Sequence, residues 1–154
     1  MFIGHLPAGY LAASLARRRL GTALFWGILA GSILPDLDML WFYLVDARQT
    51  HHHDYITHRP ALWAAMFLLG LALRHRLIAG LGLGGILHMG LDSIVGKIAW
   101  AWPVSSHAAP LVVVPATHDW WVLSFLTHWT FLFEIGICLI AFALFWRRRK
   151  RGGL

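Results

Sequence analysis

Long apolar stretches separated by short polar or basic segments dominate the pattern of this chain. There are four strong stretches and a weaker one at the start: Phe2 to Ala16, Leu20 to Val45, Ala61 to Leu73, Leu77 to Trp102 and Trp120 to Trp146. Three exceed the roughly 20 residues needed to cross a hydrocarbon core of about 30 Å, and the short Ala61 stretch is expected to start near Thr57. The pattern predicts an all-α fold, a polytopic membrane bundle of about five helices, with residues 1–154 forming a single transmembrane domain.

Composition sets the chain apart from soluble domains. Of its 154 residues, 58% are hydrophobic and 13% are charged, and the mean hydropathy is +0.63. Ordinary soluble domains carry about 25% charged residues. The single cysteine, Cys138, excludes an intrachain disulfide and a thiolate metal cluster. Any metal ligands must therefore be histidine and aspartate.

The basic residues predict how the chain lies in the membrane. The formal net charge is +6, and the basic residues gather in three clusters that each end an apolar stretch, at Arg17–Arg19, Arg74–Arg76 and Arg147–Arg151. If all three clusters are cytoplasmic, the N-terminus lies outside and residues 147–154 form a basic cytoplasmic tail. The alternative is a nucleic-acid-binding tail. We favour the topology signal, so the expected partner is the lipid bilayer and no nucleic acid.

Separate segments deliver polar side chains to one level of this bundle. At 1.5 Å per residue, Asp36 lies about 24 Å above the cytoplasmic end of its helix, and His88 and Asp92 lie about 16 and 22 Å above the end of theirs. His128 lies about 12 Å below the outer surface, and His5 begins the first helix at that surface. An aspartate at a helix centre costs about 2.5–3.5 kcal/mol on insertion scales, a cost that a bound divalent cation offsets. The sequence predicts a metal site in the outer leaflet.

The stretch "ILPDLDML" predicts a break in the second helix. In a regular helix Asp36 and Asp38 point to nearly opposite sides and cannot both line one cavity. Pro35 removes a backbone hydrogen bond and disfavours helical geometry at Leu34, so we expect an extended or one-turn segment that aims both carboxylates inward. The alternative is a proline kink at which one aspartate caps the helix that restarts.

The stretch "HMGLD" places His88 and Asp92 four residues apart, on one helical face. This spacing allows two side chains to grip one ion, although the pair can also simply hydrogen-bond to each other. Inside a membrane the functional interpretation is favoured.

The loop "HHHDYITHRP" is the third source of candidate ligands. Its consecutive histidines can also be a surface tract, but His53 and His58 lie nearest the predicted level of the site. Arg59 is a candidate for binding an anionic substrate, or it pairs with Asp54.

Other polar residues and glycines receive weaker expectations. His118 and Asp119 are expected to cap the last helix, His128 is a candidate second-sphere partner or proton carrier, and no role is evident for His107 or Glu134. Five glycines are expected at close helix-packing positions, namely Gly9, Gly27, Gly31, Gly84 and Gly85.

Four motifs occur in an order that resembles a known family. The segments "HLPAGYLA", "LPDLD", "HDYITHRP" and "HMGLDS", the last followed by "AWP", resemble the bacterial inner-membrane family described as membrane-bound, metal-dependent hydrolases, some of them under SOS control. In the loop motif Asp54 stands where arginine is usual and Arg59 where serine is usual, while His53, Thr57 and His58 keep their places. The resemblance covers about the first two-thirds of the chain and implies a metal site in the bacterial inner membrane.

These observations lead to one main functional hypothesis. We expect a metallohydrolase that cleaves a phosphoester or ester, a phospholipid or lipid-linked phosphate, at the periplasmic or extracellular side. The His-x-x-x-Asp pair is similar in chemistry to the multi-zinc sites of bacterial phospholipase C and S1-type nucleases. The expected catalytic residues are Asp38, Asp92 and His58, and the expected substrate contact is Arg59. The expected metal ligands are His5, Asp36, Asp38, His53, His58, His88 and Asp92.

The seven expected ligands exceed the four that one tetrahedral zinc needs, so two ions are plausible. Manganese or iron would suit the same ligands. Two alternatives use the same residues. One is a transporter for a divalent cation or protons, which would need polar residues continuing inward from the site. The other is a non-catalytic, metal-stabilised membrane protein.

Overall fold

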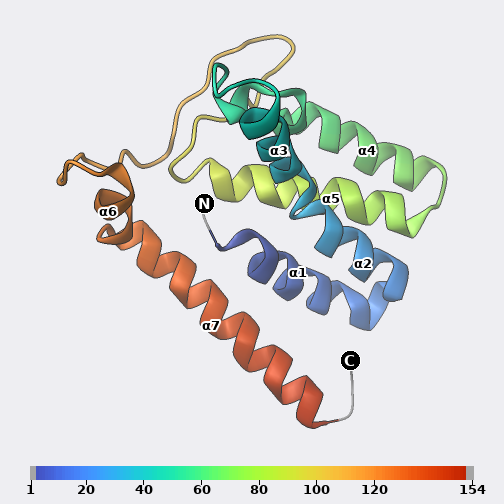
Figure 1. Cartoon of the computed structure of the whole chain (residues 1–154). Helices are drawn as coiled ribbons and strands as arrows, with labels where there is room; N and C mark the ends of the chain where they lie inside the picture. Colours follow the sequence, from blue (N-terminus) through green and yellow to red (C-terminus); the bar gives the residue numbers. More distant parts are fainter. Residues whose placement is uncertain (1–2, 152–154) are drawn as a thin grey trace.

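The computed structural model describes residues 3–151, which form helices joined by loops (Figure 1). Its only strand-like pairing there is one isolated bridge between Ile98 and Ala109. The all-α prediction is confirmed, but about five helices was too few. The elements are α1 (His5–Leu20), α2 (Thr22–Gly31), η1 (Leu34–Leu37), α3 (Asp38–Leu44), η2 (His52–Asp54), η3 (Ile56–His58), α4 (Pro60–Ala72), α5 (Arg76–Asp92), α6 (Trp121–Leu126) and α7 (Trp129–Lys150), where η marks a 3-10 helix.

The predicted break in the second helix is confirmed. Helix α2 ends at Gly31 and α3 begins at Asp38, and the two segments are bent by 45°. Between them the 3-10 turn η1 carries Pro35 in its first turn. Proline is tolerated there because its missing N–H would have no helical partner at that position.

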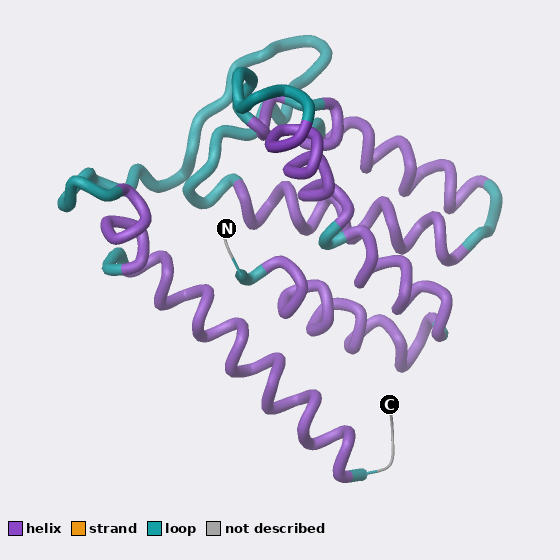
Figure 2. Tube along the Cα trace, in the orientation of Figure 1, coloured by secondary structure: helices purple, strands orange, loops and turns teal. Residues whose placement is uncertain are grey.

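The fourth predicted helix is shorter than expected. We expected it to reach Trp102, but α5 ends at Asp92, and the carbonyl of Asp92 then accepts hydrogen bonds from the N–H groups of Val95 and Gly96 at 3.3 and 2.6 Å. These bonds close a tight turn in place of the next helical turn. Residues 93–120 continue as a long loop, shown in teal in Figure 2.

The last predicted helix is divided into α6 and α7. The Thr127 hydroxyl donates to the Leu123 carbonyl at 2.9 Å, and the ring of His128 accepts from the Thr130 N–H at 3.4 Å. Such side chain to backbone bonds compete with the helical ladder and cap a new helix. His128, which we expected inside a span, is therefore the N-cap of α7.

Glycines allow α2 and α5 to pack backbone against backbone. A Cβ added at Gly84 would lie 2.3 Å from the Ile28 carbonyl oxygen, and one added at Gly27 would lie 2.4 Å from the Leu77 carbonyl oxygen. Only a residue without a side chain fits such contacts. Close packing is confirmed for all five predicted glycines, namely Gly9, Gly27, Gly31, Gly84 and Gly85.

The helices differ in how far they could cross a membrane. Among the described residues, α7 alone is long and apolar enough to span by itself, at 22 residues or about 33 Å. The bent pair of α2 and η1–α3 meets the same standard when taken together. Helix α4 is apolar but has 13 residues.

The expected basic tail is partly helical. Helix α7 continues to Lys150, so Arg147 to Lys150 belong to its last turn and do not form a separate tail. Cations are favourable there because they face the negative end of the helix dipole. Residues 152–154 of the expected tail lie outside the described residues.

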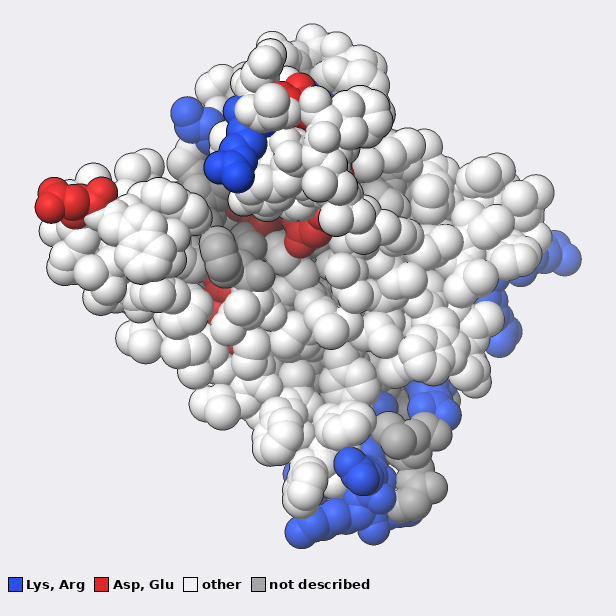
Figure 3. Space-filling view, in the orientation of Figure 1, with Lys and Arg blue, Asp and Glu red and all other residues white. Residues whose placement is uncertain are grey.

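Charge divides the molecule into two ends (Figure 3). Described basic side chains at the ends of α1 and α7 and at the turn between α4 and α5 lie at one end, and uncharged surface covers the middle. Many large apolar side chains are exposed, including Leu44 of α3 at 79% and Leu139 of α7 at 63%.

The packing of α2 on α5 gives a matched pair of glycine substitutions. Gly84→Ala should lower the free energy of unfolding by about 1–3 kcal/mol, because its Cβ meets backbone that cannot move aside. Gly90→Ala, in the same helix with nothing within 4 Å of the added Cβ, should be neutral or raise stability by up to about 1 kcal/mol. Thermal unfolding in detergent measures both. Equal melting temperatures for the two variants would contradict this account of the packing.

Candidate metal centre

Four side chains from three separate elements converge at the end of the bundle opposite the basic residues. Asp36 comes from η1, His58 from η3, and His88 and Asp92 from α5. One ligand atom of each lies within 4.8 Å of the others. His58 and His88 are fully buried and Asp92 is 2% exposed, whereas the side chain of Asp36 is 35% exposed. We call these four residues the tetrad.

The spacing within the tetrad suits a tetrahedral ion. His88 Nε2 lies 3.0 Å from Asp92 Oδ2 and 3.5 Å from Asp36 Oδ1, and His58 Nε2 lies 3.6 and 3.8 Å from the same two oxygens. Ligands held at about 2.0–2.1 Å from a tetrahedral zinc are about 3.3 Å apart. The observed separations bracket this value, so the donor set fits a small divalent cation.

Both tetrad histidines are held with Nε2 facing the group. His88 Nδ1 donates to the Ser32 carbonyl at 2.9 Å, and His58 Nδ1 donates to Asp38 Oδ2 at 2.6 Å. Each Nε2 atom is buried and makes no hydrogen bond. A partner on one ring nitrogen fixes the tautomer and leaves the other nitrogen as a ligand, which is the usual arrangement around metal-binding histidines.

Asp38 is placed behind the tetrad. Its Oδ2 accepts from His58 and from the Thr57 hydroxyl at 2.5 Å, so this oxygen positions a ligand histidine. The ring of His58 thus lies between Asp36 and Asp38. This agrees with the expectation that both carboxylates point inward. The 3-10 turn makes this possible because residues two apart differ by about 120° around its axis, against about 160° in an α-helix. The capping alternative was wrong, since neither aspartate makes a side-chain cap to η1 or α3.

His5 joins the site from the start of α1. Its Nε2 lies 3.0 Å from Asp92 Oδ1, and its ring stacks on that of His88 with centroids 3.8 Å apart. Glu134 of α7 accepts from the N–H groups of Ile3 and Gly4 at 2.7 and 3.2 Å. These donors are unpaired in any helix start, so Glu134 fixes the end of α1 that carries His5. No pattern in the sequence indicated this role for Glu134.

His53 lies beside the tetrad and forms a second group with His52 and His58. Its Nε2 is 3.7 Å from Asp92 Oδ2, and a Cβ on Gly96 would come within 2.3 Å of its ring. Burial, with some help from the neighbouring His52, lowers the pKa of His53 to about 3. The ring is therefore neutral at physiological pH, the form that ligates a cation or accepts a proton.

The remaining candidate residues lie apart from the tetrad. Arg59 donates to the Asp54 carbonyl oxygen at 2.6 Å, and its guanidinium lies 3.8 Å from the Asp54 carboxylate. Of its two expected partners, an anionic substrate or Asp54, the structure therefore shows Asp54. His107 and His118 are exposed. The His118 N–H donates to Ser124 at 3.0 Å, at the start of α6.

A cavity of about 560 Å³ opens beside His53. Lys97 and three loop histidines provide positive or polar lining, Asp54 adds one carboxylate, and Trp121 and Phe125 provide an apolar wall. Cavities of about 300–1,000 Å³ with this mixed lining are typical of small-ligand sites. His53 lies between this cavity and Asp92, and none of the tetrad residues lines the cavity itself.

Comparison with known proteins gives one match. No curated protein and no solved structure matches this chain. The family model described as YdjM inner membrane protein matches residues 1–153, which is nearly the whole sequence. The chain therefore belongs to the YdjM inner membrane protein family.

Proposed function

We propose that this protein is a membrane-embedded, metal-dependent hydrolase that cleaves a phosphoester or ester of a lipid or lipid-linked phosphate at the outer face of the inner membrane. The observation that carries the proposal is the tetrad, in which two buried histidine Nε2 atoms face two carboxylate oxygens at 3.0–3.8 Å. A hydrogen-bonded core network would leave neither nitrogen without a hydrogen bond.

A multi-pass arrangement in the membrane is part of this proposal. Large apolar side chains are exposed on α3, α4 and α7, for example Leu44, Leu68 and Leu139. A soluble protein rarely exposes so much contiguous apolar surface. The clusters at Arg17–Arg19, Arg74–Arg76 and Arg147–Arg151 hold ten of the thirteen basic residues, so the positive-inside rule supports a cytoplasmic basic end and a periplasmic tetrad.

The donor set favours zinc, and manganese or iron would also suit two imidazoles and two carboxylates. When bound, the cation supplies a Lewis acid that activates water and polarises the ester. His58 belongs to both candidate ligand groups, but its Nδ1 is bonded to Asp38, so its single remaining nitrogen serves one ion at a time. The geometry thus favours one tightly held ion over two.

The surrounding residues have separable tasks. Asp38 and the Ser32 carbonyl hold the rings of His58 and His88 in the ligand orientation. Asp92 presents one oxygen to the tetrad histidines and the other to His5. His53 lies between the cavity and Asp92, where its neutral ring can hydrogen-bond to a substrate or to water.

The cavity next to His53 supports an amphipathic substrate. Lys97 offers a positive charge to a phosphate or another anion, and Trp121 and Phe125 offer apolar contact to an alkyl chain. Since Arg59 is bonded to Asp54, Lys97 replaces Arg59 as the preferred contact to the anion.

The geometry gives less support to a transporter. Transport requires polar groups continuing inward from the site, and Glu134 was the one candidate below His88. Its carboxylate accepts from Ile3 and Gly4 at the start of α1. A non-catalytic metal protein would have the same ligands, and turnover separates it from an enzyme.

Metal content tests the ligand assignment. The purified protein should retain close to one equivalent of zinc or manganese after dialysis, and His88→Ala should lose it. Asp38→Ala should bind about 10–100-fold more weakly, because it removes only the residue that orients His58. His107→Ala, an exposed histidine, is the matched control. Elemental analysis measures all four, and wild-type metal content in His88→Ala would rule out the tetrad as the site.

Hydrolysis tests the reaction. The metal-loaded protein in detergent should hydrolyse at least one of three probes, namely p-nitrophenyl phosphate, bis-p-nitrophenyl phosphate and a mixed phospholipid extract followed by phosphorus NMR. Asp92→Asn should reduce the rate at least about 100-fold, whereas the exposed Asp119→Asn should not change it. His53→Asn should keep the metal and slow turnover by about tenfold, because it removes one hydrogen bond to the substrate or to water. Full activity in a folded Asp92→Asn protein would exclude the assignment.

A further inference from the structure

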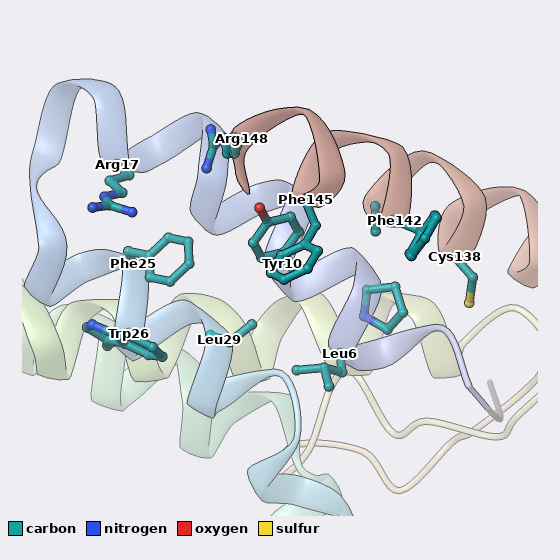
Figure 4. Close-up of a pocket in the computed structure, with 12 residues that line it drawn as sticks. Leu6, Tyr10, Arg17, Phe25, Trp26, Leu29, Cys138, Phe142, Phe145 and Arg148 are labelled. Atoms are coloured by element: carbon teal, nitrogen blue, oxygen red, sulfur yellow. The ribbon is translucent and has the colours of Figure 1, made fainter. Parts of the chain in front are cut away.

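A second cavity, unrelated to the tetrad, lies between α1, α2 and α7 (Figure 4). It has a volume of about 710 Å³, and its walls are almost entirely apolar, including Leu6 of α1, Leu29 of α2 and Phe142 of α7. This volume is within the range of about 300–1,000 Å³ of ligand sites. We call it the α1–α7 groove.

One end of the groove carries all of its charge. Arg17 and Arg148 line it, and none of the described lining residues is acidic. Figure 4 shows both guanidinium groups and the Tyr10 hydroxyl toward the same end, with Leu6 and Cys138 toward the other. The groove therefore has one cationic end and one apolar end.

The cationic end keeps hydrogen-bonding capacity for a ligand. Arg148 donates to the Ser14 hydroxyl at 2.8 Å and to the Ser14 carbonyl at 3.1 Å, which uses two of its five N–H donors. Arg17 lies over the Phe25 ring at 5.5 Å. The Tyr10 hydroxyl is buried without a hydrogen-bond partner. A phosphate oxygen is an acceptor that Arg148 and the Tyr10 hydroxyl could share, and Arg17 adds a second positive charge at this end.

The length of the groove matches one leaflet. Leu6 and Arg17 are eleven residues apart on α1, or about 17 Å along the helix. Half of a hydrocarbon core of about 30 Å is about 15 Å. The groove is thus long enough to hold an acyl chain of one leaflet that starts at the arginines.

We propose that the α1–α7 groove binds an anionic phospholipid of the cytoplasmic leaflet, with an acyl chain between the three helices and its phosphate at Arg17, Arg148 and Tyr10. Basic pockets between membrane helices on the cytoplasmic side are suited to such headgroups. The bound lipid fills the space between α7 and the pair of α1 and α2. The proposal depends on a cytoplasmic basic end and not on hydrolysis.

Native mass spectrometry tests this proposal. The full chain in neutral detergent is titrated with phosphatidylglycerol and with phosphatidylcholine of the same acyl chains. The wild type should prefer phosphatidylglycerol by roughly thirtyfold, as expected for two arginines at a membrane surface. Equal binding of the two lipids, or a second copy of the chain in place of lipid, would overturn the proposal.

Variants separate charge recognition from apolar filling. Arg17→Gln leaves the bonds between Arg148 and Ser14 in place and should weaken phosphatidylglycerol binding about fivefold, and Arg17→Gln with Arg148→Gln should abolish the preference. Arg149→Gln, exposed and outside the groove, is the control. Ala141→Phe fills the groove with both arginines intact and should remove lipid binding while metal content stays unchanged. Wild-type lipid binding by the double arginine variant or by Ala141→Phe would overturn the proposal. So would a loss of phosphatidylglycerol preference in Arg149→Gln equal to that in the double variant.

Discussion

The packing of imidazoles against carboxylates in a largely buried pocket is the constraint on which the rest of this structure depends. Asp92 is 2% exposed, and rings from three other elements, together with His88 of its own helix, lie within 3.7 Å of its oxygens. A carboxylate buried in this way is unfavourable unless positive charge or donors surround it. Each element that reaches the pocket is shaped accordingly. The 3-10 turn at Pro35 directs Asp36 and Asp38 toward the ring of His58. Glu134 accepts from the N–H of Ile3 and so holds the start of α1, with His5, beside Asp92.

The scaffold beneath the pocket is rigid for a different reason. Helices α2 and α5 meet along glycines, so their backbones touch and Ser32 comes close enough for its carbonyl to accept from His88. Backbone contacts of this kind have little freedom to relax. A loose helix pair would let the ring of His88 turn, and the ligand nitrogen would lose its direction.

The described charged residues are unevenly distributed over the molecule. Asp36, Asp38, Asp92 and most histidines lie in or beside the tetrad, whereas the described basic side chains at the ends of α1 and α7 and at the turn between α4 and α5 lie at the opposite end (Figure 3). Between them the outer faces of α3, α4 and α7 are apolar. An enzyme of this form would receive an amphipathic substrate at the cavity beside His53, and the α1–α7 groove would meet lipid at the opposite face.

The sequence by itself determined the helical class, the break at Pro35, the glycine contacts and most of the polar residues that meet. These features follow from local rules: apolar length predicts helices, the missing N–H of proline predicts the break, and the small size of glycine predicts close packing. The cost of an aspartate in an apolar run predicts that polar side chains meet there. The sequence did not determine where α5 ends, how α6 separates from α7, or that Asp38 lies behind His58 and does not join the tetrad. The helix ends depend on local turn and side-chain hydrogen bonds that apolar length does not reveal, as at Asp92 and Thr127. The position of Asp38 depends on a bond to His58, and the start of α1 depends on the bonds from Ile3 and Gly4 to Glu134, which join groups far apart in sequence. Only the tertiary structure brings such partners together, because residue spacing along the chain carries no information about which distant donor and acceptor will meet.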